Sequence, residues 1–152
     1  MSKLPPPFDE HGQHWLKFRV YYEDTDFTGM VYHANYLRFF ERGRSDFLRD
    51  AGVSHQNLLA RETPAAFTLT NVEVDYKRAA KVDDLLTIRT RNLGVRGVRM
   101  FFEQTCLCGD EIIAEGRITV VMIHTDGRPM RPIPDIVEQL RPFKFQPPLD
   151  AS

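Results

Sequence analysis

The residues best suited to chemistry lie at positions 21–36, which read YYEDTDFTGMVYHANY. Three acids, Glu23, Asp24 and Asp26, come directly before a segment that is expected to begin a helix. A helix N-terminus carries unpaired N–H groups and a partial positive charge, so it can hold an anion or polarise a carbonyl oxygen. Asp24 or Asp26 is therefore either a structural cap or a catalytic carboxylate. Gly29 favours a backbone that turns sharply or allows a ligand to approach closely.

A calcium site in this loop is disfavoured by two features. Asp24, Asp26, Thr28 and Gly29 match the first positions of an EF-hand loop, but the last ligand position holds Asn35 instead of a bidentate Glu. The preceding residues also alternate like a strand, whereas an EF-hand loop follows a helix. The histidines are scattered and share no carboxylate motif, so we predict that the chain has no metal site.

Hydrophobic periodicity predicts the elements that position the loop. Residues 16–22 alternate between apolar and polar side chains, as in a half-buried strand. Residues 36–51 carry apolar and small side chains at steps of three and four, which predicts a long helix ending at Gly52. The remaining predicted elements are strands at 67–76, 85–93, 98–108 and 112–124, and short helices at 54–61 and 134–140.

The order of these elements predicts an α+β architecture. Short links between consecutive strands indicate antiparallel pairing, and one long apolar helix must be covered by the sheet. A sheet of about five strands wrapped around one central helix leaves an open side, so we expect association with a second copy. Arg44 falls within the apolar arc of the helix. It is expected to form an ion pair, across a subunit interface, with an acid such as Glu41 or Asp50.

Composition and charge restrict the class of protein. A length of 152 residues corresponds to one domain, and 20 basic against 21 acidic residues give no overall attraction to nucleic acid. Residues 1–14 and 142–152 are rich in proline, which predicts a flexible arm and a flexible tail around a domain at 15–141. The two cysteines are expected to be reduced, and no apolar leader or membrane-spanning stretch is present, which favours a cytoplasmic protein.

The run VYYEDTDFTGMVYHANYLRFFERGR at 20–44 resembles the signature region of hotdog-fold acyl-CoA thioesterases of the 4-hydroxybenzoyl-CoA thioesterase type. It is similar to the branch of that family encoded with the Tol-Pal envelope system. The resemblance extends over about 15–141. It includes the stretches VEVDY at 72–76, KVDDLLTI at 81–88, FFEQ at 101–104 and DGRPMRPIP at 126–134. It implies the hotdog fold and hydrolysis of acyl thioesters.

The resemblance also implies roles for particular residues. Asp26 falls where the family carries its catalytic carboxylate, and the backbone N–H of His33 would point at the thioester oxygen. The sequence has Phe27 and Thr28 where close relatives often have two small residues, which leaves the size of the substrate open. The substrate entrance would be lined by Gly29, Val31, Tyr32 and Asn35.

This chemistry is physically coherent. A thiol is a good leaving group because its pKa is about 8.5, so one carboxylate and a set of oxyanion donors suffice. Asp26 would act either as a nucleophile or as a general base, and both roles remain open. The imidazole of His33 would either position water or simply be hydrogen-bonded at the helix start. No cofactor is needed, since coenzyme A belongs to the substrate, and its phosphates would meet Arg91 and Arg96.

The sequence thus predicts a thioesterase for short-chain or aromatic acyl-CoA, with acyl carrier protein thioesters as a second substrate class. It would act as a homodimer or homotetramer, without nucleic-acid or membrane partners. The alternative is a hotdog module that binds an acyl thioester or a partner protein of the envelope machinery without catalysis. A binding module has no need of a carboxylate beside oxyanion donors, so Asp26 favours the enzyme.

Overall fold

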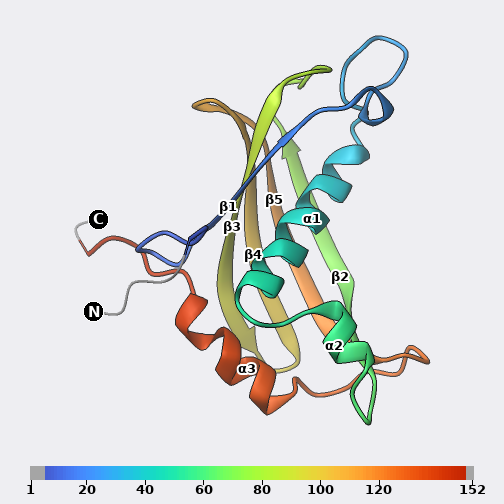
Figure 1. Ribbon diagram of the computed structural model, residues 1–152, viewed down its shortest axis with the longest axis vertical. Coiled ribbons are helices and arrows are strands. Elements are labelled where there is room, and N and C mark those ends of the chain that lie inside the picture. The colour runs from blue at the N-terminus through green and yellow to red at the C-terminus, as the bar shows by residue number, and fades with distance from the viewer. Residues whose placement is uncertain (1–5, 150–152) are drawn as a thin grey trace.

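The computed structural model describes residues 6–149, which fold around one antiparallel sheet (Figure 1). The five strands lie in the order β1-β3-β4-β5-β2, and every neighbouring pair is antiparallel. This arrangement confirms the predicted α+β class. The strands are His14–Arg19 (β1), Ala65–Tyr76 (β2), Leu85–Arg96 (β3), Arg99–Cys108 (β4) and Glu111–His124 (β5).

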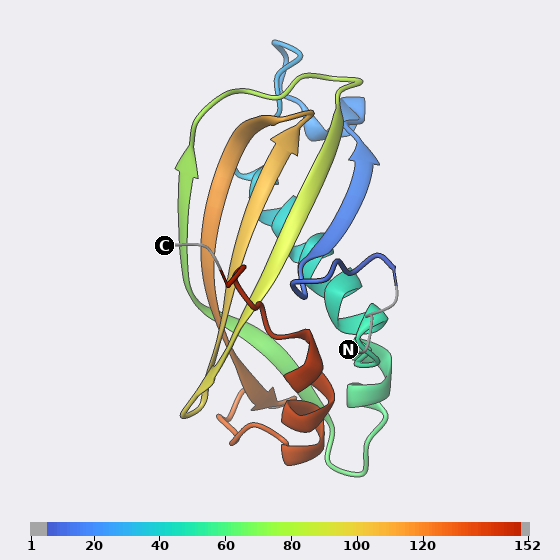
Figure 2. The ribbon, with the colours of Figure 1, turned by 90° about the vertical axis from the view of Figure 1, so that its left-hand side faces the viewer.

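The longest helix, α1 at Asn35–Asp50, lies along one face of the sheet (Figures 1 and 2). Phe39, Phe40 and Phe47 are fully buried in the core. They recur at helical spacing, so they form one apolar side that faces the sheet. Burial of each Phe side chain contributes about 1.5–3 kcal/mol, which makes this stripe the main reason that α1 is held in place.

Gly43 lets α1 approach the sheet closely. A Cβ atom added at Gly43 would lie 2.6 Å from Cγ2 of Ile88 on β3 and 2.9 Å from the side-chain amide of Gln104 on β4. Real Cβ atoms do not approach other heavy atoms this closely, so a larger residue would push the helix away from the strands.

The strands present different chemistry on their two faces. On β3, Ile88 and Thr90 are fully buried on the side of α1, while Arg89 and Arg91 alternate onto the opposite side. The connections of β3 to β4 and of β4 to β5 are tight turns containing Gly97 and Gly109, both with positive φ. Period-two alternation and these turn residues explain why the strand predictions fit so closely.

Two short helices cover the end of the sheet that is remote from the loop at 21–34 (Figure 1). They are α2, His55–Leu59, and α3, Pro134–Leu140. The hydroxyl of Ser54 accepts a hydrogen bond of 3.0 Å from the N–H of Asn57, so Ser54 caps α2 as its residue type predicts. At the start of the chain β1 ends at Arg19, earlier than expected, because Tyr22–Asp24 forms a single turn of 3-10 helix.

The packed unit is larger than the predicted domain at 15–141. Phe8 is buried, and its ring centroid lies 4.6 Å from that of Phe143 and 5.2 Å from that of Phe47. The N–H of Phe145 donates a 2.8 Å hydrogen bond to the carbonyl of Asn92 on β3. One aromatic residue in each proline-rich segment thus joins the core. The flexibility predicted for residues 1–5 and 150–152 concerns positions outside the described residues.

The edge strand β2 leaves apolar side chains at the surface. Leu69, Val72 and Tyr76 are each more than a third exposed, and β5 is the only strand hydrogen-bonded to β2 within residues 6–149. An exposed strand edge of this kind is open to pairing with another chain. Within the described part of the chain, no helix is both long and apolar enough to cross a membrane.

Candidate active site

The loop that carries the acids folds as a small hairpin. Thr25 pairs with Val31, and the N–H of Asp26 donates a 2.9 Å hydrogen bond to the carbonyl of Met30. Gly29 closes the turn with φ +82°, a conformation that side chains disfavour, and its N–H donates to the carbonyl of Asp26 at 3.2 Å. The sharp turn expected at Gly29 is therefore present.

The hairpin is fixed against the segment that leads into β3. The N–H of Val31 donates to the carbonyl of Ala80 at 2.8 Å, and the N–H of Val82 donates to the carbonyl of Gly29 at 3.0 Å. Two hydrogen bonds therefore hold the hairpin on a part of the chain that is distant in sequence. Val31 and Gly29 thus contribute through their backbones.

Asp24 is the structural acid of the loop. Its side chain is only 5% exposed, and its two oxygens accept hydrogen bonds of 2.9 Å from the backbone N–H of Tyr21 and the side-chain amide of Asn35. Its carbonyl accepts a further bond, at 3.1 Å, from the N–H of Tyr32. Asp24 therefore ties the loop to the first residue of α1, and the amide of Asn35 is used for that bond.

Asp26 is the accessible acid. Its Oδ1 accepts hydrogen bonds from both the N–H and the hydroxyl of Thr28, and Oδ2 accepts none from residues 6–149. These bonds, chiefly the one from the Thr28 hydroxyl, hold the pKa of Asp26 below its ordinary value of 3.8. Asp26 lies at the surface, outside the two cavities described below. It is ionised at neutral pH and presents one oxygen to an incoming molecule.

The N-terminus of α1, which follows the hairpin, offers unpaired hydrogen-bond donors. The N-cap residue is Ala34, which has no side-chain acceptor, and no acceptor within residues 6–149 meets the N–H of His33 or Ala34. The hydroxyl of Tyr76 on β2 donates to the carbonyl of His33 at 2.9 Å, and the rings of Tyr32 and His33 lie 4.5 Å apart. The bond from Tyr76 fixes the peptide between His33 and Ala34, and the N–H of Ala34 in that peptide remains available to a ligand.

The structure does not bring Arg91 and Arg96 to this place within one chain. Both belong to β3, whose first residue lies close to the hairpin, and Arg96 stands at the far end, roughly 36 Å along the strand. Arg91 pairs with Glu103 at 2.8 Å and donates to Gln13 at 2.6 Å. Arg96 stacks over the ring of Phe101. These partners could not be predicted from local sequence, because Gln13 precedes β1 and Phe101 and Glu103 lie on β4.

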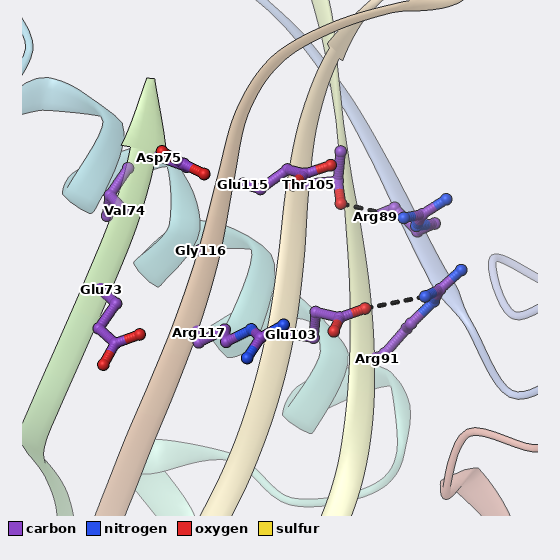
Figure 3. Close-up of a pocket in the computed structure, with 10 residues that line it drawn as sticks. All are labelled: Glu73, Val74, Asp75, Arg89, Arg91, Glu103, Thr105, Glu115, Gly116 and Arg117. Atoms are coloured by element: carbon purple, nitrogen blue, oxygen red, sulfur yellow. Dashed lines mark hydrogen bonds and ion pairs between the residues drawn. The ribbon is translucent and has the colours of Figure 1, made fainter. Parts of the chain in front are cut away.

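A broad cavity of about 610 Å³ lies on the face of the sheet that is opposite α1 (Figure 3). Its charged residues lie in rows across the strands. Arg117 on β5 lies opposite Glu73 on β2 and Glu103 on β4 in the strand register. The acids outnumber the arginines by four to three, so this surface does not suit the phosphates of coenzyme A. The lining residues are Glu73, Val74, Asp75, Arg89, Arg91, Glu103, Thr105, Glu115, Gly116 and Arg117.

A second cavity, of about 290 Å³, lies between α1, α2 and the sheet. Arg44 lines it and is buried, but its acceptor is the neutral Gln104, at 3.0 Å. Glu41 instead accepts a 2.7 Å bond from Ser45, and Asp50 pairs with His14 at 2.7 Å. Neither acid pairs with Arg44 within the chain.

No group of three or more His, Cys, Asp or Glu side chains within residues 6–149 is arranged to hold a metal ion. In the loop that was compared with an EF-hand, Asp24 is already used by Tyr21 and Asn35. The site therefore consists of one accessible carboxylate, a set of unpaired backbone N–H groups, and neighbouring aromatic rings.

Comparison with known proteins places this geometry in a family. A family model described as the thioesterase-like superfamily matches residues 20–143. The acyl-CoA thioesterase YbgC of Haemophilus influenzae is 41% identical over 115 residues, which cover 76% of this chain and 82% of that protein. The acyl-CoA thioester hydrolase YbgC of Escherichia coli is 38% identical over 115 residues, with 75% and 83% covered.

A solved structure agrees with these relatives. The crystal structure of a probable thioesterase from Bartonella henselae is 41% identical and matches with a TM-score of 0.77, covering 80% of this chain and 99% of that chain. The resemblance seen in the loop and helix sequence is confirmed over nearly the whole fold. The chain belongs to the thioesterase-like superfamily and has its hotdog fold.

Proposed function

We propose that this chain hydrolyses acyl-CoA thioesters to a free carboxylic acid and coenzyme A, with Asp26 as the catalytic carboxylate. The relatives named above are called acyl-CoA thioesterase and acyl-CoA thioester hydrolase. The observation that carries the proposal is the combination of two features in one hairpin and the helix that follows it. An ionised carboxylate with a free oxygen lies in the hairpin that leads into the uncapped N-terminus of a 16-residue helix.

These two features match the needs of thioester cleavage. The thioester carbonyl oxygen would lie on the N–H groups of His33 and Ala34, which stabilise the negative charge that develops there. The bond from Tyr76 to the carbonyl of His33 holds the N–H of Ala34 in place, so this donor needs no rearrangement during the reaction. The thiolate leaves without a dedicated general acid because a thiol ionises readily, with a pKa of about 8.5.

The lowered pKa of Asp26 favours a nucleophilic role. A general base works best when its pKa is close to the operating pH, and Asp26 lies far below neutrality. As a nucleophile, Oδ2 attacks the carbonyl carbon, the C–S bond breaks and the thiolate departs. Water then hydrolyses the mixed anhydride. If water attacks the carbonyl of Asp26, single turnover in water carrying heavy oxygen leaves the label on Asp26, and the general-base route can never label that side chain.

The predicted substrates are short-chain and aromatic acyl-CoA, and acyl carrier protein thioesters are a second group to test. Phe27 is 98% exposed at the tip of the hairpin, so it is placed to meet a substrate or a carrier as it approaches. A panel of acetyl-, hexanoyl- and benzoyl-CoA, with the same acyl groups on acyl carrier protein, would define the acyl group and the carrier.

The test of the proposal is thiol release by Asp26→Asn. This change keeps the size of the side chain and removes the charge, so we expect hydrolysis to fall by about 100- to 10,000-fold. Asp126→Asn is a matched control, because Asp126 also accepts a bond, at 3.0 Å, from the backbone N–H two residues later in an exposed turn. Undiminished release by folded Asp26→Asn would exclude Asp26 from the mechanism.

A further inference from the structure

The smaller cavity, between α1, α2 and the sheet, has mostly apolar walls and one cation. Its volume of about 290 Å³ lies near the lower limit of small-molecule sites in proteins. The apolar wall is formed by Leu48, Phe67, Leu69, Phe102 and Val120. Among residues 6–149, Arg44 is the only arginine or lysine in the lining, and it comes from the middle of α1.

Arg44 has no ion-pair partner within residues 6–149, although the nearby Glu41 attracts its charge. Arg44 is 8% exposed, and only its Nη1 has an acceptor within residues 6–149, the side-chain oxygen of Gln104 at 3.0 Å. Burial lowers the pKa of the Arg44 guanidinium, which reflects the cost of holding this charge away from water. A buried charge of this kind is ordinarily paired with an acid.

Gln104 fixes the position of Arg44. The side-chain amide of Gln104 donates hydrogen bonds to the carbonyl of Phe40 at 2.8 Å and to the hydroxyl of Thr90 at 2.9 Å. Because both donors are used, the oxygen of Gln104 is held toward the guanidinium. Arg44 is therefore presented to the cavity from a rigid support, with its other nitrogens unused by the described residues.

The other ionisable groups in the lining are engaged with one another. Glu41 accepts a 2.7 Å bond from the hydroxyl of Ser45, and that hydroxyl also contacts Nε2 of His55 at 2.8 Å. Glu41 and His55 are exposed at the rim. No ion pair joins Arg44 to an acid anywhere in residues 6–149.

We propose that this cavity binds a small carboxylic acid, with the carboxylate on the unused N–H groups of Arg44 and the apolar body against Leu48, Phe67 and Val120. A guanidinium matches a carboxylate in charge and in the geometry of its donors. The cavity volume suits an aromatic or short aliphatic monocarboxylate. A thioester or an amide has no carboxylate and lacks the group that Arg44 selects.

This ligand class is also the class of the product. If the proposed hydrolysis holds, the chain releases a free carboxylic acid and can bind it at Arg44. Within one chain this place is about 15 Å along α1 from Ala34, at the N-terminus of the helix. The product link rests on the proposed function, whereas the carboxylate site rests only on the cavity and its cation.

The first experiment is an NMR titration of the wild-type protein with benzoate and hexanoate. We expect saturable shifts of the Arg44 side-chain N–H signal and of residues in the cavity wall. Benzamide has the shape of benzoate without its charge, and we expect it to bind at least about tenfold more weakly. No saturable shifts at the cavity, or equal binding of benzamide, would overturn the proposal.

Two variants locate the site. Arg44→Met removes the cation and should weaken benzoate binding about 10- to 100-fold. Arg49→Met is the matched control, since Arg49 lies on the same helix, is exposed and pairs with Asp46. Leu69→Trp fills the cavity while keeping Arg44, so it should also weaken benzoate binding. This variant provides the test if Arg44→Met fails to fold. Unchanged benzoate affinity in either folded cavity variant would contradict the site.

The same variants separate a ligand site from a subunit contact. If Arg44 instead pairs with a second copy of the chain, Arg44→Met should change the oligomeric state measured by sedimentation velocity, and benzoate should not bind at the cavity. These two results together would overturn the proposal. Asp26→Asn should keep benzoate affinity while losing thiol release. Loss of hydrolysis and loss of the carboxylate site are therefore distinguishable.

Discussion

At the residue scale, the two aspartates of the loop have different tasks although they are two positions apart. Asp24 is buried and uses both carboxylate oxygens to hold the loop on α1, whereas Asp26 keeps one oxygen unpaired at the surface. The sequence identified both as candidates for a cap or a catalytic group. It could not assign one role to each acid, because Asn35 on the helix comes next to Asp24 only when the loop is folded.

Replacing Asp24 should destabilise the protein. Asp24→Ala leaves the N–H of Tyr21 and the amide of Asn35 without their acceptor, at a cost of about 1–3 kcal/mol for the buried amide and less for the part-buried N–H. Urea denaturation measures the change, and Glu23→Ala at the exposed neighbouring position is the control. Equal stability of the Asp24 and Glu23 variants would show that the loop does not depend on this carboxylate.

The pH dependence of hydrolysis should report the environment of Asp26. The ionised form is required, and its pKa is depressed, so activity is present above the folded-state pKa and is lost as the pH falls through it. The acid limb should therefore lie below 3.8. Thr28→Val removes the hydroxyl that contributes most to the shift, so it should move the limb to higher pH.

Initial rates across the acid range, in buffers where the protein stays folded, measure this shift. Thr70→Val is the control, since Thr70 lies on β2 and its hydroxyl bonds only weakly, at 3.4 Å, to the carbonyl of Thr119. An acid limb that does not move in Thr28→Val would mean that another group governs the profile.

At the scale of elements, the helix and the strands were predictable because each carries a regular pattern. The stripe with Phe39, Phe40 and Phe47 repeats at helical spacing, and the strands alternate with a period of two. The burial of Phe8 and Phe143 was missed because each is a single aromatic residue beside prolines, with no period to detect. The bond from Arg44 to Gln104 joins residues far apart in sequence, so local patterns carry no signal of it.

The close approach of α1 to the sheet can be tested at Gly43. Alanine is favoured over glycine by about 1 kcal/mol in an open helix, but here its Cβ would meet Ile88 and Gln104. We expect Gly43→Ala to destabilise the protein by about 1–3 kcal/mol in urea denaturation. In a double-mutant cycle with Ile88→Ala, the Gly43→Ala change should cost less than it does in the wild type, since the clashing methyl group is absent. A stabilised Gly43→Ala variant would disprove the close packing.

At the scale of the whole molecule, one chain leaves functional surfaces uncovered. The strand β2 presents an unpaired edge with Leu69, Val72 and Tyr76 exposed, and Asp26 lies at the surface of its own chain. The sequence predicted an open side from the count of elements alone. It could not indicate which edge, because the order of strands in the sheet depends on long-range pairing.

We therefore expect the purified protein to sediment as a homo-oligomer. Val72→Lys places a charge on the exposed edge and should shift the population toward the monomer. Ile112→Lys, at a similarly exposed apolar position on β5, is the control and should leave the assembly unchanged. A wild-type protein that remains monomeric at every concentration would refute this expectation.

The most direct measurement is the ratio of kcat/KM for benzoyl-CoA between Asp126→Asn and Asp26→Asn, both verified as folded. The account predicts a ratio of at least about 100, because Asp26, and not Asp126, lies in the hairpin that leads into the N-terminal donors of α1. A ratio close to one, with wild-type rates in both variants, would contradict it.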